Sequence, residues 1–447
     1  MRTPLPYFPD LGARLRACAG PQDRALWLRP GSRRQELFAA FPSSALLYLN
    51  QAIKKEKEGG ILTVPTWRDF WEELPRLLFQ PPSAAGLEDL PFRGGIMGFL
   101  GYEHSPDSST PEFPGAYMGI YPRFVYIDHS RQTAELVTTH GADPMGAEWE
   151  KLFGNVTSFT GRSAPAFRLR TPFAPLTPIT QYREHFSRIQ AYLQAGDCYQ
   201  VNYAQAFHAG CEGSSSSAMA CLIKESDPAH AAWISLPEGD VMCLSPELFL
   251  RVDKGRITSK PIKGTAPRAS DTLTDTRWRN ELARSSKNLA ENLMIVDLLR
   301  HDIAQHAETG SVKVEKLFEV ESLPHVHHLV STVTGRLRKD SATVDLIRDA
   351  FPGGSITGAP KKRAMQIIAE LEPTPRSIYC GSIGYIGSDG DALLNIAIRT
   401  LLRIGDDLYA WAGGGIVADS ECDKEYQECF DKIGALMSAL ERMGPQD

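Results

Sequence analysis

Three glutamates on predicted helices have the spacing and chemistry of a metal site. Glu291 lies in a helical pattern over residues 276–304, and Glu425 and Glu428 are three residues apart in another over 424–442. Residues three apart share one helix face, and Mg²⁺ binds through one or two carboxylates with waters and substrate oxygens. A solvated acidic face would give the same pattern, and the spacing alone favours that reading.

Glycine-rich segments raise the question of a phosphate site. Gly353–Gly358 has the outer glycine spacing of a P-loop, but Ala359-Pro360 stands where the Lys-Ser/Thr pair belongs. Gly413–Gly415 lacks the third glycine of the dinucleotide fingerprint and sits in a predicted strand. Residues 355–361 do read as a helix start, whose free N–H groups attract an anion such as a carboxylate. On this segment alone, a merely capped helix is favoured.

The cluster His325, His327 and His328 suggests zinc by composition. No cysteine or distant histidine pattern completes a tetrahedral set, so a zinc site is not expected. Two amides are better candidates for a site surface. In a predicted strand over 198–207, Gln200 and Asn202 alternate onto one face, toward either solvent or a cavity.

The elements around these residues predict an α+β fold with largely antiparallel sheets. A helix capped by Thr180 and ended by Gly196 precedes the strand at 198–207. Further strands are predicted at 241–251, 256–263, 326–337, 382–387, 393–403 and 408–418, and helices at 276–304, 360–371 and 424–442. Several strands are joined by turns too short for a helical crossover, which indicates antiparallel pairing.

A proline-rich stretch at residues 163–179 is the one convincing boundary, because it cannot hold a regular helix. It divides an N-terminal region, 1–162, from a denser region, 180–445. The serine run at 214–217 is predicted to be a surface loop.

Charge and composition exclude several classes of partner. The 447 residues carry a formal net charge of -6, which leaves no basic surplus for nucleic acid or an anionic membrane. No apolar run approaches the roughly 20 residues that span a bilayer, and the start does not resemble a signal peptide, so we expect a cytoplasmic protein. Eight scattered cysteines without a CxxC pair are expected to be reduced thiols.

Taken together, the segments resemble one family, the chorismate-utilising enzymes, which include anthranilate, aminodeoxychorismate, isochorismate and salicylate synthases. The resemblance runs from about residue 89 to about residue 442 and depends on the number and order of its motifs. They are Asp89–Phe92, Gly196–Asn202, Ser245–Glu247, Pro261–Thr265, Glu291–Asp297, His328–Ser331, Phe351–Lys361, Ile398–Thr400 and Ala412–Ser420.

Two positions separate the reactions of this family. The members that add water resemble one another in having a lysine base where this chain has Gln200, and an amide cannot act as that base. The second position lies in the motif Pro261–Thr265, where anthranilate synthases have a sequence similar to PIAGT. This chain reads PIKGT there, which resembles the members that aminate chorismate at C4. Lys263 is therefore the residue that decides the expected activity.

The resemblance implies a fold of two facing antiparallel sheets with surrounding helices, and it implies residue roles. Lys263 would attack C2 of chorismate as the C4 hydroxyl leaves, Glu247 would protonate that hydroxyl, and ammonia would then enter at C4 and expel the lysine. Magnesium would be held by Glu291 and Glu428, with Glu425 close by. Substrate-binding positions carried over from the family are Gly264, Thr265, His328, Thr357, Tyr379, Arg399, Gly413, Gly414, Gly415 and Lys432.

The same resemblance implies partners. No cysteine with a downstream His-x-Glu is arranged as a class I amidotransferase requires, so ammonia is expected from a separate glutaminase subunit. A lyase acting on the aminated product would follow. The competing interpretations are an anthranilate synthase component I, against which Lys263 argues, and a chorismate-binding regulatory protein without catalysis.

The chain departs from the family pattern at two places. His301 stands where asparagine is usual, which leaves the expected ligands intact. Leu49 stands on the N-terminal strand where relatives that hold tryptophan have a serine, and its side chain cannot form the missing hydrogen bond. We therefore expect that tryptophan does not strongly regulate this protein.

Overall fold

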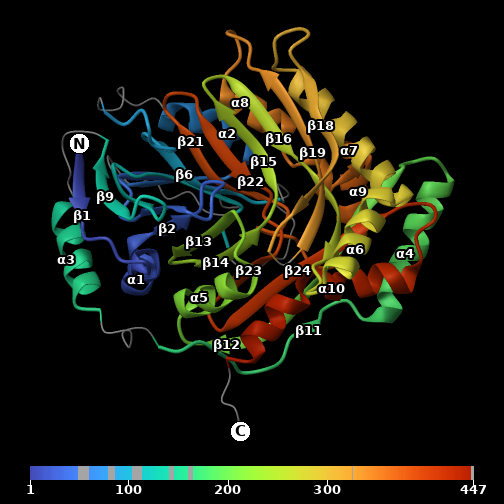
Figure 1. Ribbon diagram of the computed structural model, residues 1–447, viewed down its shortest axis with the longest axis horizontal. Coiled ribbons are helices and arrows are strands. Elements are labelled where there is room, and N and C mark those ends of the chain that lie inside the picture. The colour runs from blue at the N-terminus through green and yellow to red at the C-terminus, as the bar shows by residue number, and fades with distance from the viewer. Residues whose placement is uncertain are drawn as a thin grey trace.

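Two large β-sheets, flanked by helices on their outer sides, form the body of the protein (Figure 1). The computed structural model describes residues 1–48, 60–78, 86–102, 113–139, 145–159, 165–324 and 326–443. All strand pairs in the described residues are antiparallel except that of β4 with β5. The expected α+β fold with largely antiparallel sheets is confirmed.

The first sheet has the strand order β1-β9-β8-β3-β2-β13-β14-β23-β24-β12-β10, and β11 and β20 also pair with β12. Its strands are β1 (Arg2–Leu5), β2 (Ala25–Leu28), β3 (Gln35–Ala39), β8 (Arg123–Asp128), β9 (Thr133–Thr138), β10 (Arg168–Leu169), β11 (Ala174–Pro175), β12 (Gln200–Glu212), β13 (His230–Leu236), β14 (Gly239–Ser245), β20 (Gly358–Ala359), β23 (Thr400–Ile404) and β24 (Asp407–Ile416).

The second sheet has the order β17-β19-β16-β15-β22-β21-β6-β7-β4-β5, with β18 added on β19. Its strands are β4 (Ser44–Tyr48), β5 (Ile61–Val64), β6 (Gly95–Leu100), β7 (Ala116–Ile120), β15 (Leu248–Asp253), β16 (Arg256–Lys260), β17 (Ile262–Pro267), β18 (Lys313–Ser322), β19 (Val326–Arg336), β21 (Ser382–Gly387) and β22 (Ala392–Asn395).

The helices cover the outside, with α6 and α7 beside β18 and β19 and α10 along β24 (Figure 1). They are α1 (Leu11–Cys18), α2 (Trp67–Leu78), α3 (Gly146–Thr157), α4 (Ile179–Gln194), α5 (Ser215–Ser226), α6 (Thr272–Arg284), α7 (Ser286–Ala304), α8 (Thr343–Ala350), α9 (Lys361–Leu371) and α10 (Cys422–Glu441), with short 3₁₀ turns η1 (Pro21–Asp23) and η2 (Gly354–Ile356). In the described residues no helix is long and apolar enough to cross a membrane.

The N-terminal region shares both sheets with the rest of the chain. β2 pairs with β13, where Trp27 and Trp233 are cross-strand neighbours in the core, and β6 pairs with β21. Strands β10 and β11, which lie in or beside the proline-rich stretch, both pair with β12. Strand pairing between the regions before and after residues 163–179 builds sheets that both regions share. The expected division of the chain at this stretch stays a prediction.

Several predicted elements differ in detail. The serine run is not a loop: it begins α5, where the buried Ser215 hydroxyl accepts a hydrogen bond from Trp233 Nε1 at 3.1 Å. Thr180 is not the cap of α4, which starts at Ile179 after Pro178. The helix predicted over 276–304 is two helices, because Ser285 ends α6 and caps α7 through its side chain.

The strand predicted at 241–251 breaks at Pro246, which separates β14 from β15. The break matters for the site because Glu247 lies in it. The strand predicted at 198–207 begins only at Gln200, and the side chain of Tyr199, just before it, is exposed. Leu49, Asn50 and His325 lie outside the described residues, so the expectation about tryptophan stays a prediction.

Candidate active site

Lys263 lies on β17, where the pairing with β19 shifts register between Ile262 and Thr265. Its Nζ donates a hydrogen bond to the Ser355 carbonyl at 2.9 Å. The following residue, Gly264, has φ +85°, and a Cβ there would come within 2.8 Å of the Asn288 side chain. Burial lowers the pKa of Lys263, although the charge of Glu291 opposes the shift, so the neutral amine needed for a nucleophile is favoured.

Glu247 is buried in the break between β14 and β15, with 4% of its surface exposed. Its backbone N–H donates to Ser245 Oγ at 3.1 Å, and its carbonyl accepts from the Ile396 N–H at 3.1 Å, which fixes the segment. Burial raises the pKa of Glu247 to about 7, against the opposing effects of a hydrogen bond from Ser355 and the charge of Lys263. A carboxyl group of this kind is partly protonated near neutral pH and can act as a general acid.

Ser355 connects these two groups. Its carbonyl accepts a hydrogen bond from Lys263, and its side chain acts to lower the pKa of Glu247 against the effect of burial. The sequence reading recognised the segment around Ser355 but gave Ser355 no role. The 3₁₀ turn η2 that contains it places this residue between the two side chains.

The three predicted metal ligands lie on α7, which carries Glu291, and on α10, which carries Glu425 and Glu428. Glu425 is buried and pairs with Lys287 at 3.1 Å, and Glu428 pairs with Lys432 at 2.6 Å. Burial raises the pKa of Glu291, with Lys263 and Lys287 opposing it. In Glu428 burial acts in the same direction, but the neighbouring Lys432 overcomes it and lowers the pKa.

Gly414 on β24 brings the sheet against the two α10 carboxylates. A Cβ at this position would lie 2.9 Å from Glu425 Oε2 and 3.3 Å from Glu428 Oε1, so only glycine leaves this space open. Glu425 Oε2 is buried without a hydrogen-bond partner. An orphaned buried carboxylate oxygen among oxygen-only donors fits a hard cation such as Mg²⁺.

The described residues contain no group of three His, Cys, Asp or Glu side chains that is arranged as a metal-binding set. Of the histidine cluster, His327 lies 2.8 Å from the Ser322 hydroxyl and 3.1 Å from an Asp275 carboxylate oxygen. Mg²⁺ commonly takes one or two protein carboxylates and completes its shell with waters and substrate oxygens, so the acidic group still fits it.

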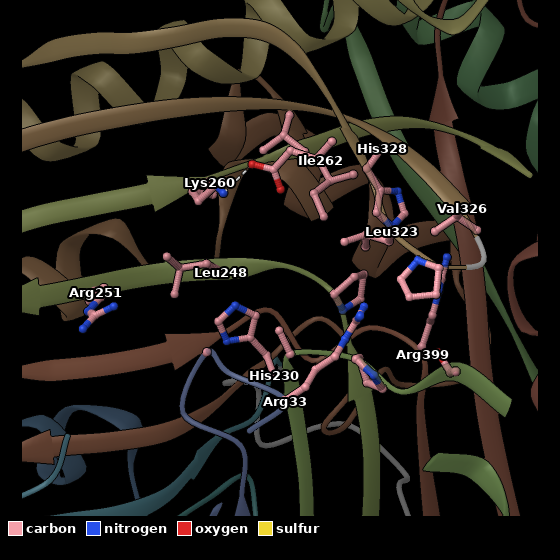
Figure 2. Close-up of a pocket in the computed structure, with 18 of the residues that line it drawn as sticks. Arg33, His230, Leu248, Arg251, Lys260, Ile262, Leu323, Val326, His328 and Arg399 are labelled. Atoms are coloured by element: carbon pink, nitrogen blue, oxygen red, sulfur yellow. Dashed lines mark hydrogen bonds and ion pairs between the residues drawn. The ribbon is translucent and has the colours of Figure 1, made fainter. Parts of the chain in front are cut away.

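His328 and Arg399 are suited to bind a carboxylate. Thr265 Oγ1 lies 2.9 Å from His328 Nδ1, and His328 Nε2 is buried without a partner. Burial, reinforced by the charge of Arg399, lowers the pKa of His328 to about 4, so this imidazole is neutral. Arg399, at φ +51°, has no hydrogen bond or ion pair from its guanidinium to any described residue. Both line one cavity (Figure 2).

The other predicted substrate-binding residues make contacts of different kinds. Lys432 Nζ donates to the Gly413 carbonyl at 2.8 Å, and Tyr379 stacks on Trp411 with ring centres 6.3 Å apart. Thr357 is fully buried, and its hydroxyl donates to the Gly353 carbonyl at 3.2 Å, so it holds its own loop.

The amide pair predicted as a site surface is buried inside the molecule. Gln200 has 1% and Asn202 has 7% of its surface exposed, and Gln200 Nε2 has no partner. This amide lies so close to Gly415 that a Cβ there would be 2.0 Å from it. Gly415 is therefore needed where Gln200 meets β24.

Sequence reasoning missed Arg376, which is fully buried and organises the loop that carries Ser355. Its guanidinium donates to the Ile356 carbonyl at 2.9 Å and to the Asn202 carbonyl at 2.5 Å, and it pairs with Glu372 at 2.6 Å. An Arg and a Glu four residues apart were the available signal, but surface helices commonly carry such pairs. His301, in contrast, is exposed on α7 and lies away from these contacts.

The two sheets with their helices thus hold a buried carboxyl group of raised pKa, Glu247, a lysine of lowered pKa, Lys263, and three further carboxylates on α7 and α10. The chain belongs to the family of chorismate binding enzymes, whose model matches residues 25–438. The resemblance noted from the motifs is thereby confirmed.

Relatives and solved structures agree with this assignment. The chain is 45% identical over 361 residues to aminodeoxychorismate synthase component 1 of Salmonella typhimurium. This match covers 79% of this chain and 78% of that protein. It is 44% identical over 364 residues to the Escherichia coli protein of the same description, covering 79% of each. Anthranilate synthase component I from Streptococcus pneumoniae superimposes with a TM-score of 0.76 at 26% identity, covering 90% of this chain and 92% of that one.

Proposed function

We propose that this protein is the chorismate-aminating component of an aminodeoxychorismate synthase, which converts chorismate and ammonia to 4-amino-4-deoxychorismate for 4-aminobenzoate and folate biosynthesis. The observation that carries the proposal is the placement of Lys263 and Glu247 on either side of Ser355. The similarity to aminodeoxychorismate synthase component 1 over most of the chain supports it.

The two residues divide the chemistry of the first displacement. The neutral Lys263 amine attacks C2 of chorismate, both ring double bonds shift by one bond toward C4, and the C4 oxygen leaves as water after taking a proton from Glu247. The adduct nitrogen is then positively charged. Burial and the nearby Glu247 carboxylate favour loss of this proton or departure of the amine.

In the second displacement, ammonia forms a bond to C4, both ring double bonds shift back, and the C2–nitrogen bond to Lys263 breaks. The excess proton on the new amine returns to the medium or to Glu247, which restores both residues. Gln200 cannot take a proton from water, so its unpartnered amide favours amination over hydration at this site.

Substrate carboxylates have clear partners among the cationic side chains. Arg399 can bind a carboxylate through two parallel N–H groups, and His328, held by Thr265, can add a hydrogen bond from Nε2. Magnesium held by Glu291, Glu425 and Glu428 would supply positive charge for the ring carboxylate. Lys432 pairs with Glu428, and its positive charge offsets part of the negative charge that would repel the substrate carboxylates.

The ammonia would come from a separate glutaminase subunit, since the relatives' description as component 1 implies a second component. An aminodeoxychorismate lyase would act downstream, and the cytoplasm is the compartment where we place this reaction. These assignments follow from the proposed activity.

A turnover assay with purified protein, chorismate, magnesium chloride and ammonium chloride tests the proposal. We expect chorismate to be consumed without release of pyruvate. Release of pyruvate with anthranilate would show the anthranilate synthase reaction instead, and binding of chorismate without turnover would show a regulatory protein.

A further inference from the structure

A buried arginine and glutamate form an ion pair that the proposed chemistry does not use. Arg376 lies between α9 and β21 and has 0% of its surface exposed. Its Nε and Nη2 donate to the two carboxylate oxygens of Glu372, at 2.8 Å and 2.6 Å. Glu372, at the end of α9, has a side chain that is 5% exposed. Replacing such a buried pair by uncharged residues of similar size often costs no stability, so stability alone does not explain its presence.

The guanidinium of Arg376 also reaches two backbone carbonyls on different elements. Nη1 donates to the Ile356 carbonyl at 2.9 Å, and Nη2 donates to the Asn202 carbonyl at 2.5 Å. Ile356 is the last residue of η2, and Asn202 lies on β12. The planar fork of an arginine can serve all these acceptors at once, and it fastens η2 to β12.

Two further bonds join this arrangement to the same strand. Glu372 Oε1 accepts a hydrogen bond from the Ala204 N–H at 2.7 Å. The Asn202 N–H donates to the Thr357 carbonyl at 2.9 Å, one residue after η2. The end of α9, the η2 segment and β12 are therefore held together around one buried charge pair.

The η2 turn transmits this arrangement to the two residues of the proposed chemistry. The Ser355 carbonyl accepts from Lys263 Nζ at 2.9 Å, and the Ser355 side chain acts on Glu247. The next carbonyl along the chain, that of Ile356, accepts from Arg376. Because the peptide unit between them is planar and rigid, fixing one of these carbonyls restricts the direction of the other.

Arg376 also packs against aromatic rings beside the site. Its Cζ lies 4.5 Å from the ring centre of Tyr102 and 5.9 Å from that of Tyr379, which is one of the predicted substrate-binding residues. Movement of the guanidinium would therefore disturb Tyr379 as well as η2.

We propose that Arg376 is a positioning residue: held by Glu372, it fixes η2 against β12 so that the Ser355 carbonyl directs the Lys263 amine toward the substrate. The inference rests on the proposed function, in which that amine is the nucleophile. Displacement of a reacting group by about 1 Å can lower a rate on the order of 10²-fold. The buried pair is thus needed for the geometry of the site more than for the stability of the fold.

Steady-state turnover with chorismate, magnesium chloride and ammonium chloride, together with urea unfolding followed by circular dichroism, tests this role. The variant Arg376→Met/Glu372→Gln removes both charges at once, and the glutamine can still accept from the Ala204 N–H. We expect kcat to fall on the order of 10²-fold and KM for chorismate to change by less than about threefold. The urea midpoint should stay close to that of the parent.

Two single variants separate positioning from a purely structural role. Glu372→Gln leaves the charge of Arg376 buried without its carboxylate, so it should be less stable than the double variant. It should nevertheless keep more of kcat, because both carbonyl contacts of Arg376 remain. Arg376→Lys keeps a charge for Glu372 but lacks the planar fork, so it should fold and have a kcat between those of the parent and the double variant.

The matched control is Arg24→Met/Glu238→Gln, which removes another ion pair, at 3.2 Å, with side chains 12% and 23% exposed. Arg24 likewise lies over a tyrosine ring, 5.8 Å from the centre of Tyr117. This pair joins the residue before β2 to the β13–β14 turn. We expect the control to have the kcat of the parent.

A parent-like kcat in the double variant or in Arg376→Lys would overturn the inference, and so would kcat values that follow the order of the urea midpoints. A raised KM with unchanged kcat would also overturn it, by giving η2 a role in binding alone. If neither Arg376 variant folds, the pair serves the fold itself, which contradicts the inference too. A parent protein that forms no 4-amino-4-deoxychorismate would instead contradict the proposed function, so the two failures are distinguishable.

Discussion

The positions of Lys263 and Glu247 in the fold shift the pKa of each side chain in the direction that its proposed role requires. Burial lowers the pKa of the lysine and raises that of the glutamate, and each opposes the shift in the other. The sequence motif predicted both residues and their roles. It could not reveal the shared contact with Ser355, which depends on a loop about 90 residues farther along the chain.

Replacing Lys263 with alanine should nearly abolish formation of 4-amino-4-deoxychorismate while leaving folding and chorismate binding largely intact. The variant loses the nucleophile that splits one difficult step into two. Product formation is measured by mass spectrometry and binding by calorimetry. The control is Lys424→Ala, an exposed lysine on α10, which should be as active as the parent. Parent-like turnover by Lys263→Ala would rule out the covalent step.

Replacing Glu247 with glutamine should lower kcat by a factor of about 10² to 10⁴, the usual contribution of a general acid. Because Glu247 is protonated below about pH 7 and Lys263 is neutral only at higher pH, kcat/KM of the parent should be bell-shaped. The residual activity of the variant should lack the inflection near pH 7. Glu319→Gln, on an exposed part of β18, is the control, and a variant profile identical to the parent's would contradict the role.

At the scale of elements, two helices and one strand assemble the acidic group. The periodicity of the sequence predicted helices for Glu291 and for Glu425 with Glu428, and a strand for Gly413–Gly415. That these elements converge could not be read from periodicity, since it depends on how α7 and α10 pack against the sheets. The break between α6 and α7 was missed because a capping serine inside a helical pattern does not interrupt its periodicity.

Glu291→Gln and Glu428→Gln should each lower activity and raise the magnesium concentration needed for half-maximal activity, because each removes a charged oxygen ligand. Magnesium titrations of turnover, together with calorimetric titration of the metal into the protein, measure the change. Asp297→Asn, an exposed residue on α7, should leave both unchanged. Full activity of the parent in the presence of a chelator would exclude a metal requirement.

At the scale of the molecule, strands from both ends of the chain share each sheet, so the site is stabilised by the whole fold. Local sequence patterns predicted most strands of the C-terminal region and the fold class, but they carry no information about the order β2-β13 or β6-β21. Buried polar groups such as Arg376 were likewise invisible, because their burial follows from that order.

A buried neutral histidine predicts how stability changes with pH. The pKa of His328 is about 4 in the folded protein and about 6.5 when unfolded, so the unfolded state binds more protons between these values. The free energy of unfolding should therefore fall as pH is lowered from 6.5 to 4, with His328 contributing about 2–3 kcal/mol. Glu247, whose pKa is raised in the folded protein, stabilises the fold as pH is lowered and so opposes the effect of His328. The contribution of His328 is therefore measured by comparing the parent protein with a His328 variant.

Denaturant unfolding at pH 7 and pH 4.5 measures this contribution. His328→Gln should lose less stability than the parent on acidification, since it has no group to protonate at this position. His301→Gln, at an exposed position on α7, should behave as the parent does. An equal pH dependence in all three proteins would contradict the assignment.

The central claim is that nitrogen from ammonia is placed on C4 of chorismate. Reaction with ¹⁵N-ammonium chloride and magnesium, followed by mass spectrometry and NMR of the product, tests it most directly. We predict a product that retains the enolpyruvyl group and carries ¹⁵N on C4. Label on C2, or an aromatic product formed with release of pyruvate, would contradict the account.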